Sequence, residues 1–392
     1  MTGDTTKVTV YYGPPSWFEG AVEESENEGL LEAVFDHEER RREFRIVQDG
    51  VERSDPDEIE RPERLIAKSS DYASLNEHVI SNFPGLIRSL NPVELHLHNP
   101  PEQVRTHLER AFPLTFSAER YRYPTATRET LVEFRDGFAG HLVGQETVRD
   151  SLLAALYPLT RASRNKPVVI MFYGPSGVGK TETAQFISGL LSGELMRKQF
   201  SMFHNENFAS YLFGGRHSEA SFARDLLDRE SGVILIDEFD KAAAVFHSAF
   251  YQFFDGGVFE DKNYRVDVGR SLIICTSNYG SDREIRNALG DALYSRFDAL
   301  IPFQPLSADE VRTVVHQLVD RRMSELDDDE QAVLDATEIK ERLESLVQNA
   351  ANVRRLGKVT SEVISMLLVE TLLSNDETDP KSNVTTTEDG AE

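Results

Sequence analysis

Residues Pro167 to Ala184 read P-V-V-I-M-F-Y-G-P-S-G-V-G-K-T-E-T-A, and this stretch decides the fold. The run from Val168 to Tyr173 is continuously apolar, which is typical of a strand buried on both faces of a parallel sheet. The eight residues that follow match the phosphate-loop pattern G-x-x-x-x-G-K-[ST], and a helix-forming run comes next. The order strand, glycine turn, helix is the context that a phosphate-binding loop requires, and it is present here. The sequence therefore predicts a phosphate-binding loop. The alternative, a glycine-rich turn that binds nothing, does not require a strand before it and a helix after it.

Each part of the predicted phosphate loop has a role. Glycines let the backbone turn its N–H groups inward without a Cβ clash, which makes an anion-binding nest at a helix N-terminus. The side chain of Lys180 then reaches the β- and γ-phosphates, and the hydroxyl of Thr181 ligates Mg²⁺. The loop consists of Gly174, Pro175, Ser176, Gly177, Val178, Gly179, Lys180 and Thr181.

Composition bounds the class of protein. The chain has 392 residues, of which 40% are hydrophobic and 28% charged, as in a globular protein of two or three domains. The sequence shows no apolar run long enough to cross a bilayer and no secretory pattern at its N-terminus, so we expect no membrane association. A single cysteine, Cys275, rules out an internal disulfide framework and fits a reducing compartment. We therefore expect a cytoplasmic protein.

The net charge of −25 bears on the choice of partner. A nucleic-acid binder normally shows a basic face, whereas the densest basic run here, Arg40-Arg41-Arg42, directly follows two glutamates. We therefore do not expect nucleic acid as a partner.

Pattern and composition divide the chain into four parts. Residues 1–125 read as a separate mixed α/β domain, and residues 126–305 as an α/β domain built around the phosphate loop. Residues 306–374 are purely helical, and the acidic, threonine-rich tail at 375–392 is expected to be disordered. The predicted fold class is α/β, with a doubly wound parallel sheet followed by a small helical region and preceded by the N-terminal domain.

The N-terminal domain shows no catalytic constellation. We expect strands at Lys7–Tyr12, Glu43–Val47 and Val93–His98, and an amphipathic helix at Pro100–Phe112. His96 and His98 share one strand face, which fits either a half-exposed surface or, with His107, a metal site. We favour the half-exposed face, because no cysteine lies near and nothing fixes a third ligand. The role of this domain cannot be read from its sequence.

A second decisive element is a buried strand that ends in two adjacent carboxylates, Asp237 and Glu238. Opposite a phosphate loop, Asp237 can hold the Mg²⁺ shell, and Glu238 can orient and deprotonate a water for attack on the γ-phosphate. Asn278 ends the next buried strand and would share that water through its amide, although an asparagine there also fits a turn. The alternative of a solvated strand end is disfavoured by the four apolar residues before Asp237.

Helices dominate the remainder of the chain. We expect them at 128–138, 146–159, 242–254, 285–297, 338–348 and 360–373. Ser307-x-x-Glu310 is a capping-box pattern that opens a further helix, and the acidic segment 326–330 is expected to be a solvated loop.

Taken together, these motifs resemble an AAA+ ATPase of the Clp/Hsp100 type. The resemblance rests on four segments in the family's order: Gly174–Ala184, Val233–Lys241, Thr276–Ser281 and Ser295–Asp298. It spans residues 142–373. It implies a doubly wound parallel sheet followed by a small helical lid, with ATP bound between them and hydrolysed at subunit interfaces.

The resemblance also implies roles for single residues. Lys180 and Thr181 match the Walker A residues that bind phosphate and Mg²⁺, Asp237 and Glu238 match Walker B, and Asn278 matches sensor 1. By the same match, ATP and Mg²⁺ are the expected cofactors.

Two arginines match residues that reach the phosphates from elsewhere. Arg296, in Ser-Arg-Phe-Asp, matches the arginine finger that acts on a neighbouring subunit, with Arg283 and Arg286 as rival candidates. Arg354, in Asn-Val-Arg-Arg-Leu, matches the sensor 2 arginine, with Arg355 as its rival. A finger acting in trans needs a neighbour, so we expect a homo-oligomer, and the family implies a hexameric ring.

Leu142 and Val143 match the two apolar residues that flank adenine in the family, but they fit a core position equally well.

The sequence also departs from the family at three places. The aromatic pore loop Gly-Tyr-Val-Gly is absent; Tyr211 and Phe213 lie in the comparable region and fit either a gripping role or interior packing. No Ile-Gly-Phe-type loop for a peptidase ring is present, and residues 1–125 do not resemble the Clp N-domain.

Three hypotheses follow. The first is a ring-forming, ATP-hydrolysing factor that remodels a protein partner recruited by residues 1–125. The second is a nucleotide-gated oligomerisation or signalling module that does not thread polypeptide. The third is a nucleic-acid motor, which is tested by whether DNA or RNA raises the hydrolysis rate.

Overall fold

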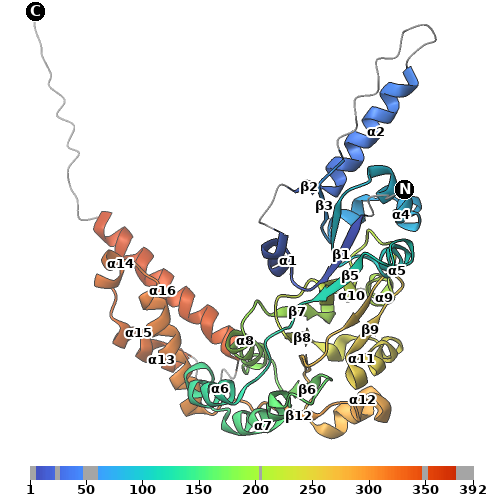
Figure 1. The fold of residues 1–392 in the computed structure, drawn as a ribbon. Coiled ribbons are helices and arrows are strands. Elements are labelled where there is room, and N and C mark those ends of the chain that lie inside the picture. Colours follow the sequence, from blue (N-terminus) through green and yellow to red (C-terminus); the bar gives the residue numbers. More distant parts are fainter. Residues whose placement is uncertain (1–5, 23–26, 47–60, 203–204, 347–351, 377–392) are drawn as a thin grey trace, which may run out of the picture.

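The computed structural model describes residues 6–22, 27–46, 61–202, 205–346 and 352–376. Two parallel β-sheets follow one another along the chain, and a group of helices comes last (Figure 1). The N-terminal sheet and the C-terminal helices lie on opposite sides of the central sheet (Figure 1). The predicted α/β fold class with a C-terminal helical region is therefore confirmed. Across these described ranges, we find no helix that could span a membrane.

The N-terminal sheet has five parallel strands in the order β2-β3-β4-β1-β5. Its elements are β1 (Lys7–Tyr12), α1 (Pro15–Val22), β2 (Glu28–Gly29), α2 (Leu30–Ile46), β3 (Arg64–Ala67), α3 (Glu77–Ser81), α4 (Phe83–Leu90), β4 (Glu94–His98), α5 (Glu102–Ala111) and β5 (Phe116–Arg120). The predicted strands at 7–12 and 93–98 and the predicted helix at 100–112 are confirmed, since β1, β4 and α5 lie there.

Two local predictions in this region were wrong. The segment Glu43–Ile46 continues α2 instead of forming a strand, because the charged run before it consists of helix-forming residues; Val47 lies outside the described residues. His96 and His98 are 7% and 2% exposed, so the face they share is buried rather than half-exposed. His96 contacts the Tyr11 hydroxyl, and His98 contacts the carbonyl of Gly13. Within the described residues, no cluster of three or more metal-ligating side chains is present.

The central sheet also has five parallel strands, in the order β12-β6-β11-β8-β7. Its elements are α6 (Arg128–His141), α7 (Glu146–Leu156), β6 (Val168–Tyr173), α8 (Lys180–Leu190), β7 (Met196–Gln199), α9 (Asn205–Phe213), α10 (Phe222–Leu227), β8 (Val233–Asp237), α11 (Tyr251–Gly256), β9 (Val258–Glu260), β10 (Arg265–Asp267), β11 (Leu272–Thr276), α12 (Asp282–Tyr294) and β12 (Ala299–Pro302). Strands β9 and β10 form a separate hairpin.

Burial on both faces of the central sheet explains its apolar strands. Every residue of β8 and β11 is buried, as are all residues of β6 before Tyr173. Their side chains pack into two hydrophobic clusters, one on each face of the sheet. Because parallel strands run in one direction, the loops that follow β6, β8 and β11 all emerge at the same edge.

The C-terminal helices form a core of their own. They are α13 (Ala308–Ser324), α14 (Asp328–Ala332), α15 (Ala336–Leu346) and α16 (Val353–Asp376). The predicted capping box is confirmed, since the Ser307 hydroxyl accepts from the backbone of Glu310 and the Glu310 carboxylate accepts from the backbone of Ser307. The segment 326–330 is not wholly a loop, because Asp327 caps α14. Residues 375 and 376 still belong to α16, and the rest of the predicted disordered tail lies outside the described residues.

Candidate functional site

The loop between β6 and α8 has a backbone that only glycine accepts without strain. Gly174, Gly177 and Gly179 have φ angles of 130°, 79° and 102°, in the region that disfavours a Cβ. A Cβ added at Gly174 would lie 2.3 Å from the carbonyl oxygen of Phe303. The loop therefore wraps closely and ends where Lys180 opens α8, which leaves backbone N–H groups at a helix N-terminus.

The Lys180 ammonium lies within this loop. It donates to the carbonyls of Gly174 at 2.6 Å and Pro175 at 2.8 Å, and it lies 3.4 Å from Oδ1 of Asn278. The residue is buried, and burial lowers the pKa of its ammonium to about 8. A buried cation held only by neutral oxygens is prepared to exchange them for an anion.

Asp237 ends β8 and is buried, and both its carboxylate oxygens are engaged. The Thr276 hydroxyl donates to Oδ1 at 2.5 Å, and the Arg197 guanidinium donates to Oδ2 at 2.9 and 2.5 Å. Arg197 comes from β7, the strand next to β8. A divalent cation at Asp237 would have to compete with the Arg197 guanidinium.

Glu238 follows in a strained backbone conformation. Its φ is 56°, which is uncommon for a residue other than glycine, asparagine or aspartate and is one of the strained conformations that cluster at functional sites. Its N–H donates to the Thr276 hydroxyl at 2.9 Å, and its carboxylate accepts from Gln199 at 3.1 Å. These contacts fix Glu238 beside Asp237 at the edge of the sheet.

The loop and the acidic strand end border one cavity of about 750 Å³ between the central sheet and the C-terminal helices. Of the residues predicted from sequence, it is lined by Leu142, Val143, Ser176, Gly177, Val178, Gly179, Lys180, Thr181, Asp237, Glu238, Asn278 and Arg354. Gly174 and Pro175 do not line it, but their carbonyls hold Lys180. Arg296 is the one predicted residue that the structure does not bring to this cavity or its loop.

The C-terminal helices close the cavity from the other side. The N–H of Val353 donates to the carbonyl of Gly177 at 2.9 Å, so the start of α16 contacts the phosphate loop directly. Arg354 follows and lines the cavity, whereas Arg355 does not. Leu142 is 6% exposed and belongs to the core cluster beside the loop, so the core position is confirmed. It also lines the cavity, and its contact with adenine stays a prediction.

Arg296 lies at the end of α12, away from the cavity of its own chain. Its guanidinium donates to Asp255 at 2.9 Å and stacks over the Tyr251 ring with a centroid distance of 4.7 Å. The rival Arg286 pairs with Asp291 on the surface. Arg296 does not line the cavity of its own chain, and its role as a finger toward a neighbour stays a prediction.

Sequence reasoning missed Arg197 and Gln199. Both belong to β7, whose four residues Met-Arg-Lys-Gln contain one apolar side chain and give no strand pattern. Pairing in register places Gln199 opposite Asp237. The signal that would have found them is topological: a strand must follow α8 and return to the sheet edge.

The region comparable to an aromatic pore loop is held by hydrogen bonds to neighbouring segments of the central domain. Tyr211 is buried and its hydroxyl donates to Asp225 at 2.6 Å, so it packs internally. Phe213 is 47% exposed, but its carbonyl accepts from the backbone of Lys262 at 3.0 Å, and Gly215 accepts from Asn263 at 3.3 Å.

A phosphate loop, an acidic strand end and a helical lid around one cavity define a P-loop nucleotide-binding module of the AAA+ class. A family model described as an AAA domain of the Cdc48 subfamily matches residues 165–324. The chaperone protein ClpB of Chlamydia muridarum is 27% identical over 294 residues, covering 63% of this chain and 33% of that protein. The ClpC subunit of Staphylococcus saprophyticus, described as the ATP-binding subunit of an ATP-dependent Clp protease, is 26% identical over 242 residues, covering 51% of this chain and 30% of that protein.

Solved structures agree on the fold. A closed-state structure of Hsp104 with ATPγS and FITC-casein superimposes with a TM-score of 0.55 at 16% identity, covering 94% of this chain and 89% of that chain. The chain contains an AAA+ ATPase module of the Clp/Hsp100 type, as its motifs predicted. It spans about a third of the length of the curated relatives it matches.

Proposed function

We propose that this protein hydrolyses ATP and uses the energy to remodel a protein partner. The observation that carries the proposal is the convergence on one cavity of a glycine cradle, a buried lysine and two carboxylates. The relatives named ClpB are chaperones, which supports a protein as the partner. We propose that the chain works as a homo-oligomer, with a hexameric ring as the expected form, in the cytoplasm.

The residues of the cavity fit ATP and Mg²⁺. The N–H groups of the loop and the Lys180 ammonium supply the donors that phosphate oxygens need. Thr181 and Asp237 are oxygen ligands of the kind Mg²⁺ prefers, and would hold the ion once Arg197 releases Asp237. When bound, Mg²⁺ neutralises phosphate charge and so eases attack on the terminal phosphoryl group.

The chain's own residues then divide the remaining work. Glu238 is positioned to take a proton from an attacking water, and the Asn278 amide shares that water. Lys180 stabilises charge on the phosphate oxygens. Arg354, near the start of α16, would contact the phosphates and so connect them to the helical lid. Arg296 would complete the site of the neighbouring subunit.

The Glu238→Gln variant tests this proposal. The amide keeps the shape of the side chain but cannot accept the proton, so ATP should bind with little change while steady-state hydrolysis falls at least about 100-fold. Glu133→Gln, on the exposed face of α6 and outside the cavity, is the matched control and should hydrolyse ATP normally. Equal turnover by Glu238→Gln and the unchanged chain would refute the role of Glu238.

A specific observation favours a second candidate, a nucleotide-gated assembly module. The segment that carries an aromatic pore loop in Clp unfoldases is anchored here through Tyr211, Phe213 and Gly215. Casein, as an unfolded probe, should stimulate hydrolysis if polypeptide is remodelled. Slow hydrolysis that ignores casein, together with ATP-dependent assembly in light scattering, would instead identify the assembly module.

A further inference from the structure

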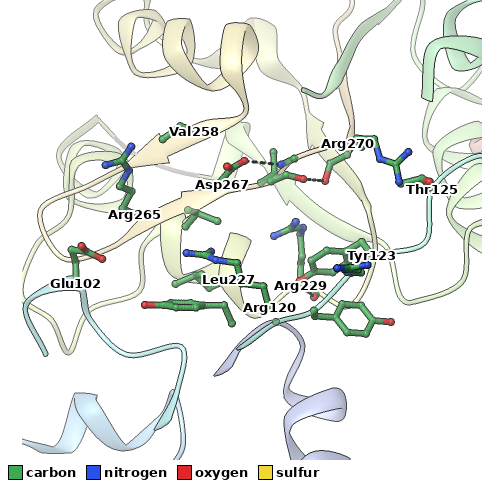
Figure 2. Close-up of a pocket in the computed structure, with 18 of the residues that line it drawn as sticks. Glu102, Arg120, Tyr123, Thr125, Leu227, Arg229, Val258, Arg265, Asp267 and Arg270 are labelled. Carbon is green, nitrogen blue, oxygen red and sulfur yellow. Dashed lines mark hydrogen bonds between the residues drawn. The ribbon is translucent and has the colours of Figure 1, made fainter. Parts of the chain in front are cut away.

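A second cavity, of about 630 Å³, lies between the N-terminal sheet and the central domain (Figure 2). Ligand pockets typically measure about 300–1,000 Å³. It is bounded by the carboxyl ends of β1 and β5, by the linker after β5 and by the β9–β10 hairpin. Its charged lining residues are Arg105, Arg120, Arg122, Arg229, Arg265 and Arg270, against the carboxylates of Glu102 and Asp267. Arg105 is paired with Glu102 and Glu109, and Arg265 contacts Glu260 at 3.9 Å. The other four arginines form no ion pair within the described residues, which is a local excess of positive charge in a chain of net charge −25.

The position of this cavity in the fold is that of a ligand site. When the strands of each sheet are numbered in their own order, both sheets read 5-1-4-3-2. Their first strands end alike, in Tyr12-Gly13-Pro14 and Tyr173-Gly174-Pro175. Open parallel sheets bind ligands outside the carboxyl ends of their strands, beside the point where strand order reverses. The second cavity opens at this carboxyl edge beside β1, on the side of β5, where Tyr12, Gly13 and Arg120 line it, whereas the central cavity lies on the side of β8 and β11.

The N-terminal sheet lacks the chemistry for hydrolysis at this edge. Pro14 and Pro15 have no N–H to offer an anion, and α1 begins at Pro15 without a Lys-Thr pair. By strand register, Lys68 and Ser69 occupy the positions that Asp237 and Glu238 hold in the central sheet. An anion here would be bound by arginine side chains and would not be activated.

Arg229 supplies an independent sign of a missing anion. It is 5% exposed, and its guanidinium stacks on the Tyr123 ring at 3.9 Å from the centroid. It donates one hydrogen bond, to the carbonyl of Leu226, while its Nε has no partner in the described part of the chain. No carboxylate there lies within ion-pair distance of it, and burial lowers its pKa. An unpaired buried cation is costly, and a bound anion would offset that cost.

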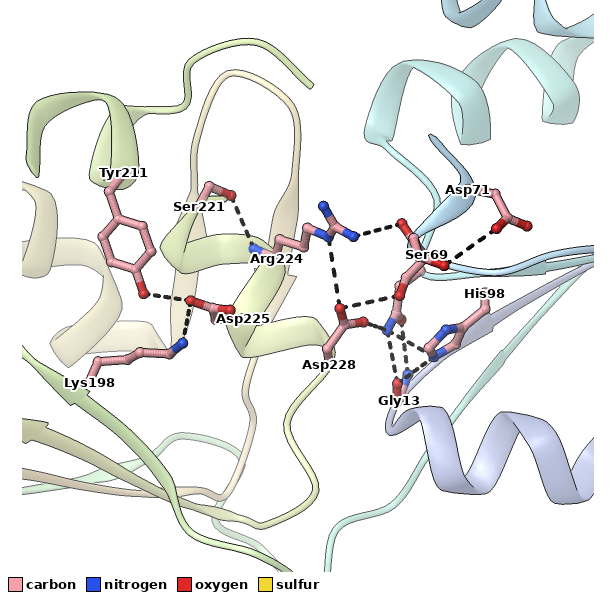
Figure 3. Close-up of polar contacts among 12 residues, drawn as sticks. Gly13, Ser69, Asp71, His98, Lys198, Tyr211, Ser221, Arg224, Asp225 and Asp228 are labelled. Atoms are coloured by element: carbon pink, nitrogen blue, oxygen red, sulfur yellow. Dashed lines mark hydrogen bonds and ion pairs between the residues drawn. The ribbon is translucent and has the colours of Figure 1, made fainter. Parts of the chain in front are cut away.

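The walls of the cavity are held together by contacts between the two domains (Figure 3). Asp228, at the end of α10, accepts from Asn99 at 2.7 Å and from the Ser69 hydroxyl at 3.2 Å. Arg224 donates to the carbonyl of Ser69 at 3.1 Å. The Tyr123 hydroxyl likewise donates to the carbonyl of Arg229 at 2.9 Å. The arginines therefore project from a preorganised frame, which lowers the entropy cost of binding.

We propose that this interdomain arginine cavity binds a small molecule with several phosphate groups. Guanidinium groups pair with phosphate oxygens through two parallel hydrogen bonds, and several of them match a polyphosphate better than a single carboxylate. The site is separate from the cavity beside Lys180, so the proposal does not depend on ATP hydrolysis there.

Calorimetry on the full chain carrying Lys180→Ala tests the proposal, because that substitution weakens phosphate binding at the central site. Sodium tripolyphosphate should bind with one-to-one stoichiometry. Removing two exposed arginines of the cavity, in Arg120→Gln/Arg265→Gln, should weaken binding at least about tenfold. Arg110→Gln, on the exposed face of α5 outside the cavity, should leave it unchanged. Since Arg120 and Arg265 are exposed, these variants should fold normally, which thermal melting will verify.

Further measurements on the same chain identify the class of ligand. Arg229→Gln should also weaken tripolyphosphate binding, and should raise the melting temperature of the ligand-free chain because a buried unpaired charge is gone. ATP that binds more tightly than tripolyphosphate in the Lys180→Ala chain would identify a nucleotide, whereas equal affinity would identify phosphate groups alone. Absence of tripolyphosphate binding, equal binding of citrate, or binding insensitive to all three cavity substitutions would overturn the proposal.

Discussion

The two sheets of this molecule share a topology but differ in what stands at their carboxyl edge. In the central sheet, the polar groups of that edge are held in arrangements that a ligand can replace. Lys180 donates to neutral carbonyls, and Asp237 is paired with Arg197. In the N-terminal sheet, the corresponding groups are satisfied by the protein itself, since Asn99 bonds both Gly13 and Asp228.

The difference teaches that strand order fixes where a site can lie, while the residues at the edge decide whether chemistry occurs there. Pairing that a ligand can replace is expected at functional positions, whereas the groups that join the N-terminal edge to the central domain are already paired with each other. Backbone strain does not separate the two edges, since Asn99 also has a positive φ, of 43°. The central edge therefore carries the proposed reaction. The N-terminal edge carries a domain contact beside a cavity that binds without reacting.

The largest expected effect tests whether the central edge is completed by a neighbouring copy. Arg296→Ala should lower ATP hydrolysis by about 10³-fold, because a finger arginine stabilises charge in the transition state. Mixing Arg296→Ala with Glu238→Gln subunits should restore activity, since each then supplies what the other lacks. Arg286→Ala removes the rival candidate, which pairs with Asp291 and stacks on Tyr294, and should leave hydrolysis unchanged if Arg296 is the finger. Hydrolysis that is unaffected by Arg296→Ala would mean that the central edge works alone.

A smaller effect sharpens the structural likeness of the two edges. A Cβ at Gly174 would lie 2.3 Å from the Phe303 carbonyl oxygen, and one at Gly13 would lie 2.4 Å from Cβ of Tyr121. Both Gly174→Ala and Gly13→Ala should therefore destabilise the fold by about 2 kcal/mol in urea unfolding. Gly20→Ala, a helix position with open space around it, should be neutral or stabilising. If Gly13→Ala were as harmless as Gly20→Ala, the two corners would not be equivalent.

The smallest effect concerns charge at the central edge. Because the pKa of Lys180 is about 8 in the free protein, roughly a tenth of the molecules keep the charged ammonium at pH 9. A bound triphosphate favours the charged form, so ATP binding takes up a proton near pH 8, and affinity falls about tenfold between pH 7 and 9. Calorimetry in buffers of different ionisation enthalpy measures that proton. The control Lys180→Arg should show no uptake, because arginine stays charged; uptake by this variant would point to another group.

Much of the central domain was predictable because its signals are local. A continuous apolar run gives β6, a glycine pattern gives the loop after it, and paired carboxylates mark the end of β8. The structure brings these elements to one cavity with Asn278 and Arg354. The catalytic roles of the individual residues stay predictions.

What the sequence did not reveal depends on contacts between distant segments. The short strands β2 and β7 have too few apolar residues for a pattern, so the strand order of the N-terminal sheet and the roles of Arg197 and Gln199 stayed hidden. The alternating apolar residues near Glu43 were read as a strand, although helix-forming neighbours extend α2 through them. Arg229 could not be singled out either, since only the fold buries it against Tyr123.

The hydrogen bond from the Val353 N–H to the Gly177 carbonyl joins the helical lid directly to the phosphate loop, so a force on the lid acts on this loop. An added Cβ at Gly177 would lie 2.2 Å from Oδ1 of Asn352, so loop and lid meet without slack. Any rotation of the lid that carries Val353 away must break a bond to the segment that would enclose the phosphates. In the proposed ATPase, a force that pulls the lid away would break this bond and open the phosphate loop, and so would shorten the time for which spent nucleotide stays bound.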